Sequence, residues 1–248
     1  MKLHVFDLDD TLLCGDSEGA WINFLMTKGF FTNNDHASVM EQFEIDYRSG
    51  NFDPEKYCLY ILQSMKGLHE KELADLSDEF IDEYFDQLVD KVTYDLLDRI
   101  EEEDIAVIAT GAMDFLGDKF SMKFEIQDCI ATKAEVKSNK ISGCLDGLPN
   151  FGSHKKANVE EWCKQKSISK EDIIFYTDSI NDFPMVEISS RNVIVCPDAY
   201  IRVFLILLYS SEWIICDESI PSSLQHSIMC FDASSFPITE DIETLIPK

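Results

Sequence analysis

Short apolar runs that alternate with helix-like segments constrain the fold of this chain more than any other feature. Each run has the length of a β-strand and is apolar almost throughout, as expected of strands that are buried on both faces. Buried strands that alternate with helices are typical of a parallel sheet covered by helices on both sides. The sequence therefore predicts an α/β fold built on a doubly wound parallel sheet. The predicted strands are residues 2–6, 105–109, 128–131, 173–176, 193–195 and 213–216.

The long gap between the first two predicted strands indicates an inserted helical domain. Apolar residues recur there at helical spacing, and Asp53-Pro54 has the form of a helix start, with proline in the first turn. The predicted division is a core over 1–13 and 92–216, a helical cap over 14–91 and a C-terminal extension over 217–248. Predicted within the core are helices over 94–103, 113–122, 156–166, 182–188 and 199–208, and a small hairpin over 136–147.

The charge balance limits the partners of the chain. With 21 lysines and arginines against 47 aspartates and glutamates, the formal net charge is −26. Nucleic acids and anionic membranes are bound mainly through lysine and arginine, so we expect neither as a partner and expect a small-molecule ligand instead. An anionic ligand would need local neutralisation by a metal, a lysine or helix N-termini.

The cysteine spacing and the N-terminal segment indicate the cellular compartment. No two of the eight cysteines have C-x-x-C spacing, and the N-terminal segment has no apolar signal-peptide core. The longest strongly apolar run, 203–209, is far shorter than the roughly 20 residues needed to span a bilayer. We therefore predict reduced thiols and a cytoplasmic protein.

Polar residues follow the predicted strands at the edge where parallel sheets bind ligands. They are Asp7 and Asp9 after the first strand, Thr110 after the second and Asp178 after the fourth, with Lys155 at the start of a helix. Because ligands bind at the carboxyl ends of such strands, we expect these side chains to converge. Three converging carboxylates repel one another, and Mg²⁺ would relieve the repulsion. The remaining hydrogen-bond donors suit a phosphoryl group.

Each of these residues also has a purely structural interpretation. An aspartate that follows a strand can cap a helix, and Thr110-Gly111 can form an ordinary turn. Adjacent lysines such as Lys155 and Lys156 usually face solvent. The coincidence of several such residues at one edge favours a functional site over these separate explanations.

The pattern resembles the four motifs of the haloacid dehalogenase superfamily of phosphohydrolases. The matching residues are Asp7-Leu-Asp9-Asp10-Thr11 for the first motif, D-x-D-x-T, Thr110 for the second, Lys155 for the third, and Asp178 with Asp182 for the fourth. The helical insertion resembles the type I cap of subfamily IB, the phosphoserine-phosphatase-like branch. Segments 7–13, 176–184 and 195–198 are similar to members of that branch labelled histidinol-phosphatase-like.

The resemblance implies a covalent mechanism. It makes Asp7 the nucleophile that carries an aspartyl-phosphate, and Asp9 the acid and base of the two half-reactions. It implies that the Asp7 and Asp178 carboxylates and the Asp9 backbone carbonyl hold Mg²⁺. It also implies that the Thr110 and Lys155 side chains bind the phosphoryl oxygens.

Further predictions concern the choice of the motif lysine and the residues beside the motifs. Lys155 is favoured over Lys156 because it lies four residues before Val159 and seven before Trp162, the spacing of the motif lysine in the family. The resemblance gives Asp182 the role of orienting the motif lysine or a metal-bound water. Gly111 and Asn181, which belong to the second and fourth motifs, are predicted to contact the substrate.

The cap carries the prediction about the substrate. Asp16 lies nine residues after Asp7, where phosphoserine phosphatases have an acid that receives the substrate ammonium. Those enzymes also hold the substrate carboxylate with an arginine, and residues 56–65 contain none. An unpaired carboxylate would be costly to bury there. An amino-alcohol phosphate such as histidinol phosphate is therefore the predicted substrate.

Three alternatives remain open at this point. The chain could be a phosphoserine phosphatase, a phosphotransferase of the same superfamily, or a non-catalytic phosphate- or partner-binding module on the same fold. The module is disfavoured because both Asp7 and Asp9 are present. The motifs do not distinguish water from a substrate hydroxyl as the acceptor of the phosphoryl group.

Overall fold

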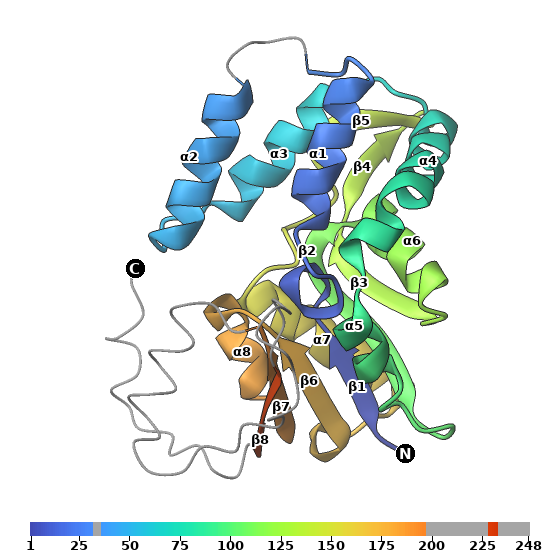
Figure 1. Ribbon diagram of the computed structural model, residues 1–248, viewed down its shortest axis with the longest axis vertical. Helices are drawn as coiled ribbons and strands as arrows, with labels where there is room; N and C mark the ends of the chain where they lie inside the picture. Colours follow the sequence, from blue (N-terminus) through green and yellow to red (C-terminus); the bar gives the residue numbers. More distant parts are fainter. Residues whose placement is uncertain (32–35, 197–227, 233–248) are drawn as a thin grey trace.

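A six-stranded sheet forms the centre of the computed structural model, which describes residues 1–31, 36–196 and 228–232 (Figure 1). The strand order is β3-β2-β1-β6-β7-β8, and every neighbouring pair is parallel except β7 with β8. The strands are β1 (Leu3–Phe6), β2 (Ile105–Met113), β3 (Asp128–Thr132), β6 (Ile173–Thr177), β7 (Arg191–Val195) and β8 (Ile228–Asp232). The predicted doubly wound parallel sheet is confirmed, with one antiparallel edge strand that lies in the predicted extension.

Both faces of the sheet are buried. On β1, Leu3 and Val5 pack with Val159, while Phe6 belongs to the larger core on the opposite face. Such double burial explains why the strands are apolar throughout. The elements around the sheet are α5 (Lys91–Leu97), α6 (Asp114–Lys123), α7 (Ser153–Lys166), α8 (Phe183–Val186) and the short turns η1 (Leu8–Leu12), η2 (Lys170–Asp172) and η3 (Ile180–Asp182).

The inserted segment is helical, as predicted, and stands above the carboxyl end of the sheet (Figure 1). Its core is aromatic: Trp21, Phe24 and Phe80 are fully buried and their rings contact one another. Asp53 caps the third helix by accepting from the Lys56 amide (3.1 Å). The helices are α1 (Ser17–Thr27), α2 (His36–Arg48), α3 (Pro54–Ser64) and α4 (Glu70–Leu88).

The predicted hairpin forms from β4 (Ala134–Lys137) and β5 (Lys140–Leu145), but it packs on the cap. The Gln63 side chain of α3 donates to the Gly143 carbonyl (2.7 Å), and the Ile141 amide donates to the Leu68 carbonyl (2.9 Å). Gly143 has φ 84°, and a Cβ there would lie 2.9 Å from the Gln63 amide nitrogen, so glycine suits this contact. A segment inside the range predicted for the core thus extends the cap.

Several element boundaries differ from prediction. The helix predicted over 94–103 is Lys91–Leu97, and the acidic residues 101–104 follow it. Negative charge at a helix C-terminus opposes the helix dipole, which explains the earlier end. β2 continues to Met113, so Thr110 and Gly111 lie within a strand, and α7 starts at Ser153, so Lys155 lies in its first turn.

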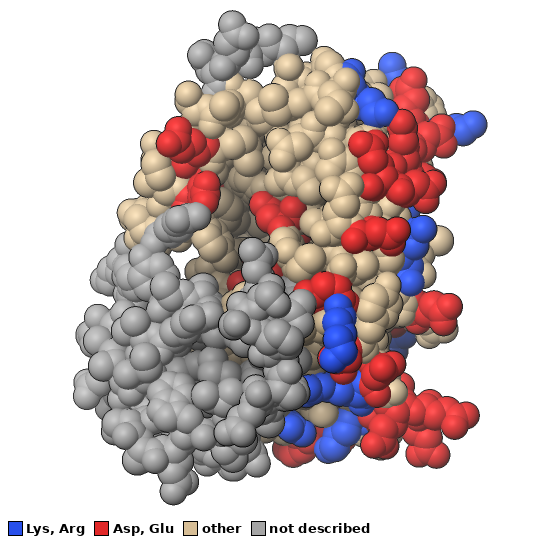
Figure 2. All heavy atoms as spheres, viewed as in Figure 1, with Lys and Arg blue, Asp and Glu red and all other residues tan. Residues whose placement is uncertain are grey.

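Two predicted elements, 199–208 and 213–216, lie outside the described residues. In the part of the chain that the structure describes, no helix combines the length and apolarity needed to cross a bilayer. The charged surface on the face shown in Figure 2 is mainly acidic, in line with the net charge.

Candidate active site

A buried lysine joins two carboxylates at the carboxyl edge of the sheet. The Lys155 Nζ lies 3.1 Å from Asp7 Oδ1, 2.7 Å from Asp182 Oδ1 and 2.8 Å from Asp182 Oδ2. Asp182 also accepts from the Thr177 hydroxyl (2.9 Å), and all four side chains are buried. The structure therefore brings together predicted residues that come from β1, from α7 and from the turn after β6.

Burial and ion pairing have opposite effects on the pKa values of Asp7 and Lys155. Burial raises the pKa of Asp7 to about 7, although the Lys155 charge lowers it. Burial lowers the pKa of Lys155, but the charges of Asp182 and Asp7 outweigh it and raise the pKa overall. The lysine is therefore a fixed positive charge, and a further cation beside Asp7 would favour the ionised carboxylate that a nucleophile requires.

Asp9 is held against the first cap helix. Its Oδ1 accepts from the Ser17 amide at 2.7 Å, at the N-terminus of α1. Burial and the charge of Asp16 raise the pKa of Asp9 well above its usual range. A carboxyl group that is readily protonated suits the predicted acid role. The neighbouring Thr11 hydroxyl contacts Asp178 Oδ1 at 3.4 Å, which links the first and fourth motifs.

The second motif is positioned by a residue that the sequence analysis did not single out. The buried Asn150 amide donates to the carbonyls of Thr110 (2.8 Å) and Ile130 (2.9 Å). The Thr110 hydroxyl, also buried, accepts from the Ala112 amide (3.0 Å), and the Gly111 carbonyl accepts from Thr132 (2.6 Å). A lone asparagine in a turn gives no sequence signal for this role.

The remaining predicted residues lie around this centre. Asp16 is exposed and caps α1 by accepting from the Glu18 amide (2.9 Å). Glu18, also missed by the sequence analysis, is buried and accepts from the Met113 amide (3.2 Å), which ties α1 to the end of β2. Asn181 donates from its side chain to the Ser179 hydroxyl (3.1 Å) in the turn after β6. These contacts leave the predicted substrate roles of Asp16, Gly111 and Asn181 as predictions.

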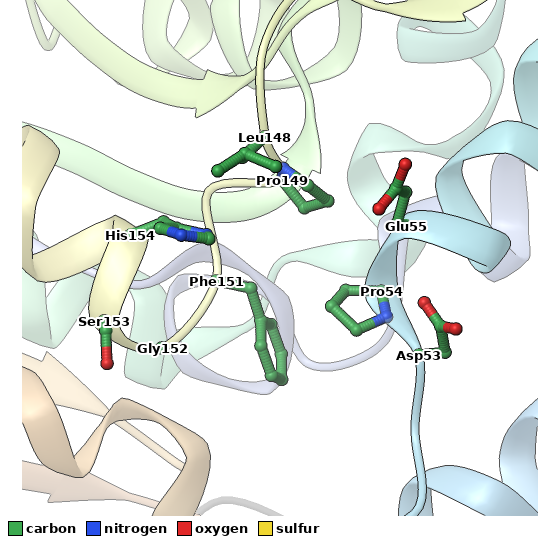
Figure 3. Close-up of a pocket in the computed structure, with 9 residues that line it drawn as sticks. All are labelled: Asp53, Pro54, Glu55, Leu148, Pro149, Phe151, Gly152, Ser153 and His154. Carbon is green, nitrogen blue, oxygen red and sulfur yellow. The ribbon is translucent and has the colours of Figure 1, made fainter.

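A cleft of about 460 Å³ opens where the cap meets the start of α7 (Figure 3). One wall is the start of α3 and the other is the segment that leads directly into Lys155. In Figure 3 the Phe151 ring lies between the segment that leads into α7 and Pro54. The lining residues are Asp53, Pro54, Glu55, Leu148, Pro149, Phe151, Gly152, Ser153 and His154. The cleft thus borders the segment before Lys155, and the Asp7, Lys155 and Asp182 side chains are not part of its lining.

The donor set fits a hard divalent cation. Within the described residues, no group of three or more histidine, cysteine, aspartate and glutamate side chains is placed to bind a metal. A magnesium site would instead rest on the Asp7 and Asp178 carboxylates, which follow the adjacent strands β1 and β6, with the Asp9 carbonyl and water. Oxygen ligands, few carboxylates and several waters are what Mg²⁺ prefers.

Residues 4–187 match the family model of haloacid dehalogenase-like hydrolases. The chain belongs to this family. The family prediction made from the four motifs is thereby confirmed, and the doubly wound sheet of this haloacid dehalogenase-like hydrolase agrees with it.

Curated relatives include two phosphatases. The hydrolase is 27% identical over 203 residues to a histidinol-phosphatase of Neisseria meningitidis, with 80% of this chain and 91% of the relative covered. It is 23% identical over 201 residues to a phosphoserine phosphatase of Mycobacterium tuberculosis, with 79% of this chain and 65% of the relative covered. The chain thus spans just under two thirds of that second relative.

Solved structures show the same fold. A protein of unknown function from Bordetella pertussis is 25% identical, with a TM-score of 0.74 over 83% of this chain and 94% of that one. A substrate-bound phosphoserine phosphatase is 17% identical, with a TM-score of 0.57 over 84% of this chain and 97% of that one. The second likeness shows a shared fold.

Proposed function

We propose that this hydrolase is a Mg²⁺-dependent phosphomonoesterase that works through an aspartyl-phosphate on Asp7. The observation that carries the proposal is the buried Lys155 bridging Asp7 and Asp182 at the ligand-binding edge of the sheet. A fixed positive charge beside a carboxylate nucleophile can hold a phosphoryl oxygen where the attack occurs. The relatives of phosphatase type support the same reaction.

The proposed reaction has two halves, and Asp9 transfers a proton in each. Asp7 attacks phosphorus, a new P–O bond forms, and the bond to the leaving alkoxide breaks as Asp9 gives the alkoxide its proton. Asp9 then takes a proton from water, and that water cleaves the acyl phosphate, which releases phosphate and regenerates Asp7. Lys155 and Thr110 hold the phosphoryl oxygens in both steps, and Asp182 keeps the lysine in position.

Mg²⁺, when bound by Asp7, Asp178 and the Asp9 carbonyl, supplies charge neutralisation for the phosphoryl group. We therefore expect excess EDTA to reduce phosphate release from p-nitrophenyl phosphate to background. Addition of Mg²⁺ beyond the chelator should restore it, which controls for damage to the protein. Turnover that continues unchanged in excess chelator would remove the metal from the mechanism.

The proposed substrate class is an amino-alcohol phosphate such as histidinol phosphate. The predicted ammonium-binding acid, Asp16, lies at the start of the cap, and α3 (Pro54–Ser64) contains no arginine to hold a substrate carboxylate. The histidinol-phosphatase of Neisseria meningitidis is consistent with this choice. A phosphoserine phosphatase is the second candidate, favoured by the other curated relative.

Replacement of Asp16 tests the substrate class. Asn also caps helices well, so Asp16→Asn should leave α1 intact while removing the charge. We expect kcat/KM to fall by roughly tenfold for histidinol phosphate, from the loss of one partly exposed ion pair, and to change little for p-nitrophenyl phosphate. Phosphoserine should be a poor substrate of the unmodified chain.

The matched control is Asp90→Asn, which alters the cap of α5 and should affect neither ester. An equal loss on both esters in Asp16→Asn would assign Asp16 to the common chemistry or to the fold. Phosphoserine as the best substrate would instead favour the second candidate and overturn the argument from the missing arginine.

A further inference from the structure

Tyr47 brings a hydroxyl group from the cap to the catalytic edge of the core. It lies in the last turn of α2, and its Oη is 3.1 Å from the Ser179 hydroxyl. Ser179 follows Asp178 directly and starts the turn that places Asp182. No sequence motif marks Tyr47, and the contact with Ser179 places it beside the fourth motif.

The hydrogen bonds around Ser179 determine which proton is available. Its Oγ accepts from both the backbone amide (3.2 Å) and the side-chain amide (3.1 Å) of Asn181. A hydroxyl oxygen has two acceptor sites and one hydrogen. When both acceptor sites are used, the Ser179 hydrogen is left for Tyr47 Oη, and the phenol hydrogen of Tyr47 is then not needed for this contact and can serve another acceptor.

The surroundings keep that phenol protonated. Tyr47 is 38% exposed, but partial desolvation and the charges of Asp178 and Asp7 raise the pKa of its phenol, and its contacts with Ser179 and Asn181 lower that pKa less. The phenol hydrogen is thus present over the ordinary pH range, on the side of the site where Asp7 and Asp178 lie. These two carboxylates mark the place where the phosphoryl group would sit.

The position of the Tyr47 ring does not depend on its hydroxyl. The ring makes an edge contact with Phe52 (5.3 Å between centroids), and Phe52 contacts Phe151 (5.8 Å), which precedes α7. These three aromatic rings connect α2 to the segment that carries Lys155. A phenylalanine at position 47 would keep the ring contacts and lose only the hydroxyl.

We propose that Tyr47 donates its phenol hydrogen to a phosphoryl oxygen of the bound substrate, as a donor supplied by the cap in addition to Thr110 and Lys155 of the core. A donor preorganised at a developing negative charge lowers the barrier to phosphoryl transfer. The inference rests on the proposed phosphatase function. Because the contact is with the phosphoryl group, it does not depend on the leaving group.

Tyr47→Phe tests the proposal through three readouts. We expect kcat/KM to fall by roughly 10–10²-fold for histidinol phosphate and for p-nitrophenyl phosphate alike, since the loss of one such donor has effects of this order. Binding of inorganic phosphate to the Mg²⁺-loaded protein, measured by calorimetry, should weaken. The melting temperature should stay within a few degrees of the unmodified chain.

The control is Tyr60→Phe, whose hydroxyl contacts His36 Nδ1 (2.5 Å) within the cap and should leave all kinetic constants unchanged. Unchanged phosphate binding and turnover in Tyr47→Phe would overturn the proposal. A loss confined to histidinol phosphate would overturn it as well, because Tyr47 would then contact the leaving group. If the unmodified chain hydrolyses neither ester, the proposed function fails, and phosphate binding still decides the role of Tyr47.

Discussion

Asp7→Asn is expected to abolish turnover of every phosphomonoester that the unmodified chain hydrolyses. The amide has nearly the same shape as the carboxylate but does not attack phosphorus, so the covalent route is lost. Lys155 keeps Asp182 as a partner in the variant, which favours retention of the fold. Phosphate release from p-nitrophenyl phosphate measures the loss, and circular dichroism checks the fold.

Asp10→Asn is the matched control for this substitution. Asp10 lies in the same turn, is exposed and has φ 52°, a conformation that asparagine adopts readily. We expect this control to retain turnover within a few-fold. Near-normal turnover in purified Asp7→Asn would show that the aspartyl-phosphate mechanism is wrong.

The two adjacent lysines should differ sharply in importance. Lys155 is 3% exposed and bridges two buried carboxylates, whereas Lys156 is only partly buried and pairs with Glu187 on the surface. We expect Lys155→Met to lower kcat/KM by ~10²–10³-fold, through the loss of a charged contact to the phosphoryl group. Lys156→Met should stay within a few-fold of the unmodified chain.

The same pair of variants should also differ in stability. Removal of Lys155 leaves Asp7 and Asp182 buried without their cation, and breaking a buried pair in this way costs ~3–5 kcal/mol. Lys156 pairs with the exposed Glu187 at the surface, and surface pairs contribute about 0–1 kcal/mol. Urea unfolding of both variants measures the difference. The reverse ranking in activity would assign the third motif to Lys156.

The central cluster was predictable from the sequence because of a general property of parallel sheets. Lys155 is separated from Asp7 by 148 positions and from Asp182 by 27, yet all three meet in the structure. Residues that follow parallel strands gather at one edge of the sheet, which accounts for Asp7 and Asp182. Lys155 follows no strand of this sheet, and its place at that edge is predicted from its position at the start of a helix and from the resemblance to the third motif. The structure agrees with this expectation for Asp7, Lys155 and Asp182.

Other features depended on contacts that the sequence pattern does not encode. The hairpin over β4 and β5 is short and could pack on either domain, and its attachment to α3 is determined by contacts such as Gln63 with Gly143. Tyr47 is one of several aromatic residues at helical spacing in the cap, where a residue of the core and one that reaches the active site look alike. Asn150 acts through backbone carbonyls, which carry no residue-specific signal.

Trapping of the covalent intermediate identifies the nucleophile. The Mg²⁺-loaded chain would be mixed with p-nitrophenyl phosphate, quenched in acid within one turnover, digested and examined by peptide mass spectrometry. We expect a phosphoryl group on the peptide that contains Asp7. It should be sensitive to hydroxylamine, as an acyl phosphate is, and absent from Asp7→Asn. A phosphoryl group on any other residue of a chain that is turning over would contradict the role of Asp7 as the nucleophile.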